Sequence, residues 1–216
     1  MTAVSATDRF EFERGLLQAG SRRIAGVDEA GRGPLAGPVV AAAVIFPAAW
    51  IEAGLPPELQ GLNDSKQLSE RQREKFFAEL HRQTEIRFAI VSVEAEVIDR
   101  INILQATHRA MNDALDHLQP DHALVDGLRV ASLRWPQTPL VQGDARSYSI
   151  AAASVLAKVT RDRMMLELDR QFPAYGFAVH KGYGTARHLA ALAQFGPCPS
   201  HRRSFAPVRA AQRELL

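Results

Sequence analysis

The sequence predicts an α/β protein in which helices pack on an open sheet. Short apolar runs that suit strands alternate with longer stretches that have the 3.6-residue period of amphipathic helices. Three of the apolar runs end in an acidic residue near a glycine, at positions 28, 126 and 144. In open α/β sheets ligands gather at the carboxyl ends of strands, so this repetition indicates one shared site.

The composition is that of an ordinary globular chain of 216 residues, with 46% hydrophobic and 23% charged residues. This length is enough for one large domain with a proper core. The longest apolar stretch, residues 38–51, is interrupted by Pro47 and is too short to cross a bilayer. No basic-then-apolar signal pattern is present, so we expect a cytoplasmic location and no membrane partner. The lone Cys198 excludes an internal disulfide and a cysteine-rich zinc site.

The charge is unevenly distributed, although the net value is only +2. Residues 1–128 hold 13 Lys and Arg against 19 Asp and Glu, whereas residues 129–216 hold 13 against 5. A basic second half suits a polyanionic partner such as nucleic acid. A loose excess of solvated charge explains the count equally well.

The N-terminal third predicts a helix followed by a hairpin. We expect residues 1–7 to be disordered and Asp8 to cap a helix that runs to residue 19, with Glu11 in the capping-box position. Apolar residues at 24–27 and 39–46 indicate two strands joined by a loop of Gly, Ala and Pro. Residues 47–62, which are rich in Pro and Gly, predict a surface connection.

The middle of the chain predicts two helices and three strands. Ser69 should cap a helix that runs to about residue 83, with Gln72 completing a capping box. Residues 85–93 alternate in hydrophobicity as a strand does, and residues 100–118 carry the helical period. Residues 122–127 and 140–144 are the two further strand endings that supply acids.

The C-terminal third predicts helices. Residues 149–169 are small and apolar on most sides, which indicates a deeply packed helix. Lys158 is the exception in its first half; it either extends to solvent or is held for an anionic ligand, and we favour the ligand. Thr185 should cap the last clear helix, and the basic segment from residue 200 onward is expected to fray.

The loop after the first strand carries the strongest chemical signal. Asp28 and Glu29 are adjacent, and adjacent strand residues point to opposite faces, so one site can use both only if the backbone bends. Gly31 and Gly33 permit a bend and allow backbone N–H groups to approach a phosphate beside Arg32. Acids for a cation next to donors for an anion suggest a metal-assisted phosphate site. The pair alone is more typical of a solvated turn than of a metal site, and the glycine spacing matches no named nucleotide motif.

Two other residues have side chains suited to a nucleic acid. Lys66 lies in a polar turn from which it could contact a phosphate. Tyr183 lies between two glycines close to Lys181, an arrangement that suits stacking on a sugar or base beside a phosphate contact. Taken singly, each also fits a plain structural role, as a solvated lysine and a packed tyrosine.

Taken together, these segments resemble the bacterial ribonuclease HII family. The resemblance covers residues 26–205 and rests on the segments 26–39, 64–66, 125–127, 143–144, 149–162 and 181–185. It implies a ribonuclease H-like fold: a five-stranded mixed sheet flanked by helices, with a helical C-terminal extension. It also implies a single domain with a core at about residues 22–206 and possible disordered tails at 1–7 and 207–216.

The resemblance implies an endonuclease that cuts RNA in RNA–DNA hybrids and cuts 5′ of single ribonucleotides embedded in duplex DNA, as in ribonucleotide excision repair. It implies a monomer. Two alternatives remain open: a non-catalytic binder of hybrid duplexes, suggested by the basic second half, and a nuclease of related fold that acts on branched DNA.

Roles carry over from the family by position. The residues that match its metal-binding carboxylates are Asp28, Glu29, Asp126 and Asp144. Gly31, Arg32 and Gly33 match the loop that recognises the ribose 2′-OH, Tyr183 matches an aromatic that stacks on the adjoining deoxyribose, and Lys66 and Lys158 match phosphate contacts. Crowded carboxylates need cations, and oxygen ligands suit Mg²⁺ or Mn²⁺. Two such ions during catalysis are implied, with Asp28 as the bridging ligand.

Overall fold

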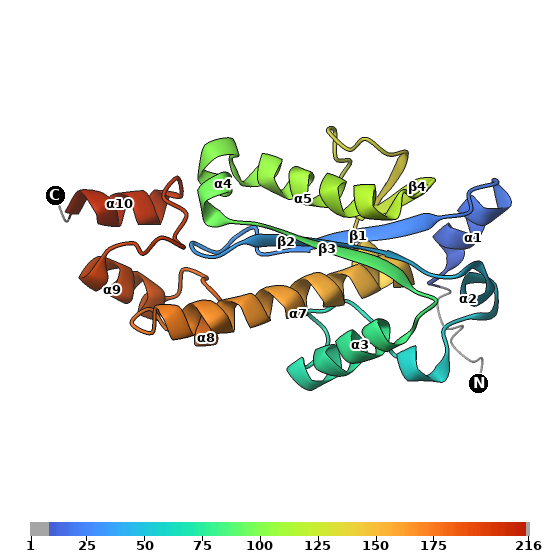
Figure 1. The fold of residues 1–216 in the computed structure, drawn as a ribbon, viewed down its shortest axis with the longest axis horizontal. Coiled ribbons are helices and arrows are strands. Elements are labelled where there is room, and N and C mark those ends of the chain that lie inside the picture. Colours follow the sequence, from blue (N-terminus) through green and yellow to red (C-terminus); the bar gives the residue numbers. More distant parts are fainter. Residues whose placement is uncertain (1–8, 215–216) are drawn as a thin grey trace, which may run out of the picture.

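The protein is seen in a computed structural model that describes residues 9–214. A five-stranded sheet forms its centre, with helices on both faces (Figure 1). The strands lie in the order β3-β2-β1-β4-β5, with bounds β1 Ile24–Ala30, β2 Val39–Ile45, β3 Arg87–Val93, β4 His122–Asp126 and β5 Gln137–Leu140. Strands β1, β2 and β3 are antiparallel neighbours, whereas β4 and β5 continue parallel to β1. The predicted α/β class and mixed sheet are therefore confirmed.

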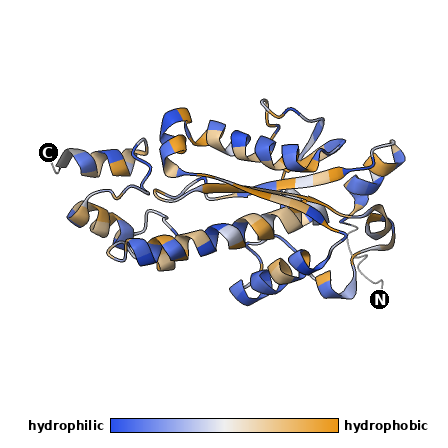
Figure 2. Cartoon of the chain, in the orientation of Figure 1, coloured by the Kyte–Doolittle hydropathy of each residue, from blue (hydrophilic) through white to orange (hydrophobic). Residues whose placement is uncertain are grey.

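Two long helices cover the two faces of the sheet. The helix α5, Ile103–Leu118, packs on one face, and α7, Tyr148–Gln171, packs on the other (Figure 1). The sheet is strongly apolar between them (Figure 2). Each face has its own core of buried side chains, because the strands alternate their side chains between the two sides.

The close approach of α7 to β1 is made possible by Gly26. A Cβ atom at this position would lie 2.1 Å from the backbone carbon of Ser149. Alanines at the start of α7 are completely buried against the sheet, as the apolar character of this segment predicted. This contact fixes the axis of α7 beside β1, the strand that carries Asp28.

The remaining helices surround this centre, and none of those in residues 9–214 is long and apolar enough to cross a bilayer. Their bounds are α1 Glu11–Gln18, α2 Ala48–Ala53, α3 Glu70–Arg82, α4 Ala95–Ile101, α6 Gly143–Arg146, α8 Phe177–His180, α9 Ala186–Phe195 and α10 Ala206–Glu214, with a 3₁₀ turn at Pro57–Leu59. The helices α1 and α10 lie at opposite ends of the molecule (Figure 1). The predicted caps at Ser69, with its capping box to Gln72, and at Thr185 are confirmed.

Three predictions about the first half of the chain were wrong. Helix α1 begins at Glu11 with Phe10 in the N-cap position and no side-chain cap, so Glu11 is the first helical residue and not the capping-box residue. Residues 1–7, predicted to be disordered, and Asp8 itself lie outside the described residues. Residues 47–62 are not a plain surface connection, because their apolar side chains join the core below the sheet and fold the segment into α2 and a 3₁₀ turn. The helix expected at 100–118 is two helices, α4 and α5, because Asn102 adopts a φ of 65° and caps α5 with its side chain.

Two predictions about the second half also need correction. The strand expected to end at Asp144 stops at Leu140, and Asp144 instead lies in the short helix α6. Residues 206–214 form α10 and are not a frayed tail. Val208 on this helix is completely buried against Leu35 and Leu192, and that contact holds the segment in place.

Candidate active site

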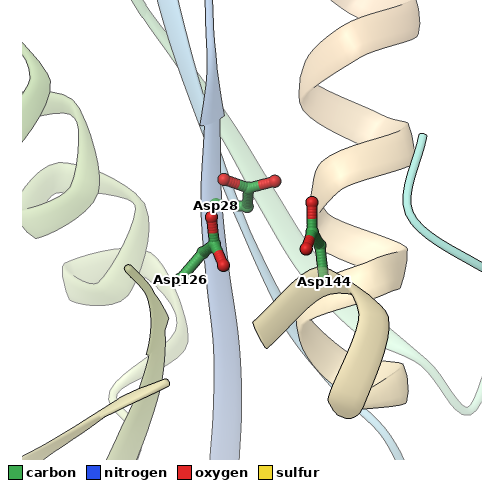
Figure 3. A group of neighbouring side chains, drawn as sticks. All are labelled: Asp28, Asp126 and Asp144. Carbon is green, nitrogen blue, oxygen red and sulfur yellow. The ribbon is translucent and has the colours of Figure 1, made fainter. Parts of the chain in front are cut away.

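Three carboxylates from three different elements converge at one edge of the sheet (Figure 3). Asp28 comes from β1, Asp126 is the last residue of β4, and Asp144 lies in α6. Each offers an oxygen atom, and these atoms all lie within 4.8 Å of one another. The convergence predicted for these three acids is therefore what the structure shows.

The sheet register explains why the first two acids meet. The parallel strands β1 and β4 place Val27 level with Val125, so the next residue on each strand, Asp28 or Asp126, reaches the same height and face. Backbone N–H groups orient the side chains: Glu29 N donates to Asp28 Oδ1 at 2.7 Å, and Gly143 N donates to Asp126 Oδ1 at 2.7 Å. The turn from β5 into α6 then brings Asp144 to the same place.

The electrostatics of this group favour a bound cation. Burial raises the pKa of Asp28 well above its usual value, and the charges of Glu29 and Asp126 raise it further. Burial, followed by the charges of Asp126 and Asp64, raises the pKa of Asp144 to about 6. Crowded carboxylates resist ionisation unless positive charge is close. Carboxylate oxygens are the donors that Mg²⁺ and Mn²⁺ prefer, so the residues present fit such an ion.

Glu29 does not join this group of three. The strand β1 continues to Ala30, and the backbone turns only at Gly31, after both acids. Asp28 pairs with Ala42, which packs toward α7, whereas Glu29 pairs with Ala41, which packs toward α5. Glu29 Oε1 lies 3.3 Å from Arg32 Nη1. The bend that would bring both acids to one face is therefore not where the sequence suggested, and the role of Glu29 as a metal ligand stays a prediction.

A pocket of about 370 Å³ opens beside Asp28 and contains most of the other predicted site residues. Its lining includes the acids Asp28 and Glu29, the loop residues Gly31, Arg32 and Gly33, the lysines Lys66 and Lys158, and Tyr183. Tyr183 is 48% exposed and faces Gly33, where an added Cβ would lie 3.6 Å from its ring. Acidic side chains that can bind a cation, basic side chains that can bind an anion and an aromatic ring that can stack therefore line one pocket.

The two lysines reach the pocket differently. Lys66 is mostly exposed, and its Nζ atom lies 3.6 Å from Asp144 Oδ2. Its turn is anchored to α7 because the Ser154 hydroxyl donates to Ser65 Oγ at 2.7 Å. Lys158 is partly buried and donates to Asp162 Oδ1 at 2.7 Å.

Two buried arginines that the sequence did not single out hold the glycine loop. Arg202 donates to the carbonyl oxygens of Gly31, Arg32, Pro34, Gly37 and Pro38 at 2.6–3.1 Å. Arg161 donates to the carbonyls of Ala36, Pro38 and Lys181. With so many carbonyls turned toward these guanidinium groups, the loop between Gly31 and Pro38 is held rigidly against the body of the protein.

A third unrecognised group is a set of buried imidazoles behind Tyr183. His180, His188 and His201 are all buried, and the rings of His180 and His188 stack with centroids 4.5 Å apart. Cys198 is buried in the same cluster, with Sγ 3.1 Å from His201 Nδ1. No periodicity or short motif predicts this cluster, because its members come from three separate segments.

Comparison with known proteins gives a consistent result. The family model described as Ribonuclease HII matches residues 25–208. Ribonuclease HII of Syntrophotalea carbinolica is 56% identical over 200 residues, covering 92% of each chain, and that of Geobacter metallireducens is 52% identical, covering 92% of this chain and 90% of the relative. Among solved structures, ribonuclease H2 from Pyrococcus horikoshii superposes with a TM-score of 0.73 at 28% identity, covering 89% of this chain and 98% of that one.

The fold and the cluster of acids together define a metal-dependent nuclease of the ribonuclease H type. Such enzymes hydrolyse phosphodiester bonds inside a strand. The chain belongs to the ribonuclease HII family, whose members act as endoribonucleases on RNA–DNA hybrids.

Proposed function

We propose that this enzyme cuts RNA–DNA hybrids and also cuts on the 5′ side of single ribonucleotides embedded in duplex DNA. The observation that carries the proposal is the placement of the three aspartates beside the pocket that holds Gly33 and Tyr183. A site that distinguishes RNA from DNA has to contact the 2′-OH. The glycine loop and the exposed ring of Tyr183 line the same pocket as Asp28, and a sugar in this pocket would lie next to the phosphate that is attacked.

In the proposed reaction Asp28, Asp126 and Asp144 would hold two divalent ions, Mg²⁺ or Mn²⁺, and Glu29 would supply a fourth carboxylate. When bound, such ions activate a water and stabilise the leaving 3′-oxygen. The products are 3′-OH and 5′-phosphate ends. Lys66 and Lys158 contact phosphates of the substrate, and their positions at the pocket support that role.

Selection of the ribonucleotide is assigned to the glycine loop and Tyr183, which also line the pocket. Gly31, Arg32 and Gly33 contact the 2′-OH through backbone groups, and Tyr183 stacks on the deoxyribose that follows. Support comes from the exposure of Tyr183 and from the rigid support beneath the loop. We further propose that the enzyme acts as a monomer in the cytoplasm.

The direct test uses a duplex with one ribonucleotide, incubated with and without Mg²⁺, with both fragment ends analysed. We expect cleavage that needs the metal and leaves a 3′-OH and a 5′-phosphate. In Asp28→Asn, turnover should fall by more than about 100-fold while duplex binding survives, because one metal ligand is lost and one negative charge is removed. Full activity in EDTA, or a 2′,3′-cyclic phosphate product, would contradict the proposal.

Specificity is tested separately with Arg32→Ala and Tyr183→Ala. Each should lower the preference for a ribonucleotide-containing duplex over an all-DNA duplex, because Tyr183→Ala removes the stacking ring and Arg32→Ala removes the side chain that pairs with Glu29 beside the loop. A branched all-DNA substrate serves as the control for the alternative activity. Unchanged preference in both variants would remove these residues from ribose recognition, and efficient cutting of the branched DNA would assign the enzyme to another substrate.

A further inference from the structure

The two parts of the pocket to which ribose recognition is assigned, the glycine loop and Tyr183, rest on one short segment, residues 198–202. Gly37 N donates to Ser200 O, and Arg202 N donates to Leu35 O, so this segment borders the glycine loop. The same segment reaches Tyr183 through a chain of buried imidazoles. Tyr183 lies between Gly182 and Gly184, two residues that restrict the backbone little. Two local bonds hold it, from Tyr183 N to His180 O and from Thr185 N to Tyr183 O, and a further bond to its carbonyl comes from His188.

The chain of hydrogen bonds has only one consistent direction. His188 Nδ1 lies 2.9 Å from Tyr183 O, and a carbonyl oxygen can only accept, so this nitrogen carries the proton. His188 Nε2 is then an acceptor, and His201 Nε2, 3.0 Å away, must donate to it. His201 Nδ1 accepts in turn from Cys198 N–H at 3.1 Å. Every donor in this chain, from Cys198 N–H to His188 Nδ1–H, therefore faces one acceptor, and the last acceptor is Tyr183 O.

The surroundings keep both rings neutral. His188 and His201 are buried, with exposures of 0% and 1%, among the aromatic rings of Tyr175 and Phe177. Burial lowers the pKa of His188, and burial together with the charge of His188 lowers the pKa of His201 to about 4. An additional proton on either ring would place two donors against each other, so the network has a single arrangement at neutral pH.

We propose that His188 and His201 are positioning residues for ribose recognition: His201 fixes the tautomer of His188, and His188 then holds the Tyr183 backbone at the correct distance from the glycine loop. The inference rests on the proposed role of Tyr183 in reading the sugar. Neither histidine touches the substrate. Their effect is on the position of the Tyr183 ring relative to Gly33 in the pocket.

A matched pair of substitutions at position 188 separates this role from general stability. The amide nitrogen of His188→Asn occupies the place of Nδ1 and can still donate to Tyr183 O, whereas that of His188→Gln occupies the place of Nε2 and cannot. We expect His188→Asn to keep the wild-type preference for the ribonucleotide-containing duplex within about twofold. We expect His188→Gln to lower this preference by about 3- to 10-fold. His188→Gln should also raise KM by a larger factor than it lowers kcat. The preference is the ratio of dissociation constants for all-DNA and ribonucleotide-containing duplexes, measured by anisotropy in EDTA.

A second pair tests the other histidine. His201→Gln retains a donor toward His188, and His201→Leu does not, so only the leucine variant should lose preference. Thermal unfolding is measured for all four variants, so that a loss of preference for the ribonucleotide-containing duplex is compared only between variants of similar stability. The wild-type protein supplies a test without substitution: ¹⁵N NMR of the imidazoles should show His188 protonated at Nδ1 and His201 at Nε2.

The outcomes are distinguishable. A wild-type enzyme without preference for the ribonucleotide duplex would contradict the proposed function itself. A wild-type enzyme with preference, combined with equal behaviour of His188→Asn and His188→Gln, would overturn the positioning role alone. His188 protonated at Nε2 in the wild-type protein would overturn it even if none of the variants folded.

Discussion

Gly31 occupies a position that other residues can adopt only with strain. Its φ angle is +96°, and an added Cβ would lie 2.0 Å from Arg161 Nε and 2.8 Å from Pro38 O. The first contact displaces a buried guanidinium that itself holds the loop through Pro38. A single methyl group at this position therefore disturbs both the backbone of the loop and its support.

We predict that Gly31→Ala costs about 1–3 kcal/mol of stability through backbone strain. We expect it to lower kcat/KM on a ribonucleotide-containing duplex by at least about tenfold, because placement errors of about 1 Å are costly. Gly15→Ala is the matched control: Gly15 lies inside helix α1 and an added Cβ meets nothing within 4 Å. The control should gain up to about 1 kcal/mol from helix propensity, measured by urea unfolding, with activity unchanged. Equal activity in both variants would refute the steric argument.

The acids of the site were predictable because they follow apolar strands, and a strand is recognisable from its own sequence. The buried arginines were not. Arg202 and Arg203 are adjacent in a basic segment, yet Arg202 is completely buried and Arg203 is exposed. Nothing local distinguishes them, because the carbonyls that Arg202 contacts belong to a loop about 170 residues earlier in the chain.

Helix α10 links the end of the chain to the glycine loop. Val208 packs against Leu35, which is part of that loop, and against Leu192 of α9. Since Leu35 N also donates to Gly182 O, the helix supports the segment before Tyr183 as well. The C-terminal helices therefore contribute to the site although they contain none of its acids.

We predict that Val208→Asp detaches α10 and loses about 2 kcal/mol, the free energy of burying one valine side chain. Amide hydrogen exchange of residues 31–38 should become faster, because the loop loses a packing partner. Ala210→Asp introduces the same charge at an exposed position of the same helix and serves as the control. Protection of the loop that stays equal in the two variants would show that α10 does not support it.

The break between α4 and α5 shows that hydrophobic periodicity does not reveal where a helix is interrupted. The apolar spacing from residue 100 to 118 continues across Asn102 without interruption, so periodicity alone predicts one helix. The break depends on a positive φ at Asn102 and on its side chain accepting from Gln105 N. Likewise, residues 47–62 carry turn residues, and their buried leucines are understood only once the core beneath the sheet exists.

At the scale of the whole molecule, the C-terminal part of the basic half forms one end. Helices α7 to α10 run from the middle of the sheet toward the C-terminal end (Figure 1). Arg187 and Arg209 are exposed there and form no ion pair within residues 9–214. Free guanidinium groups at this end of the molecule are suited to contact the phosphates of a duplex that extends past the site.

We predict that Arg187→Gln combined with Arg209→Gln weakens duplex binding and flattens its salt dependence. Each phosphate contact contributes about 0.9 to the slope of log K against log salt, so the double variant should lose about 2. Arg22→Gln, an exposed change at the opposite end of β1, should leave the slope unchanged. The measurement is anisotropy at several salt concentrations, and equal slopes for all proteins would place the duplex elsewhere.

The sulfur atom beneath the imidazole chain has a practical consequence. Cys198 is 7% exposed, and burial raises the pKa of its thiol, so little reactive thiolate is available at neutral pH. The natural sequence contains no other cysteine. A new cysteine on the outer surface of α9 or α3 would therefore accept a maleimide dye selectively, and the motion of the enzyme along a duplex could be followed by fluorescence without first removing the native thiol.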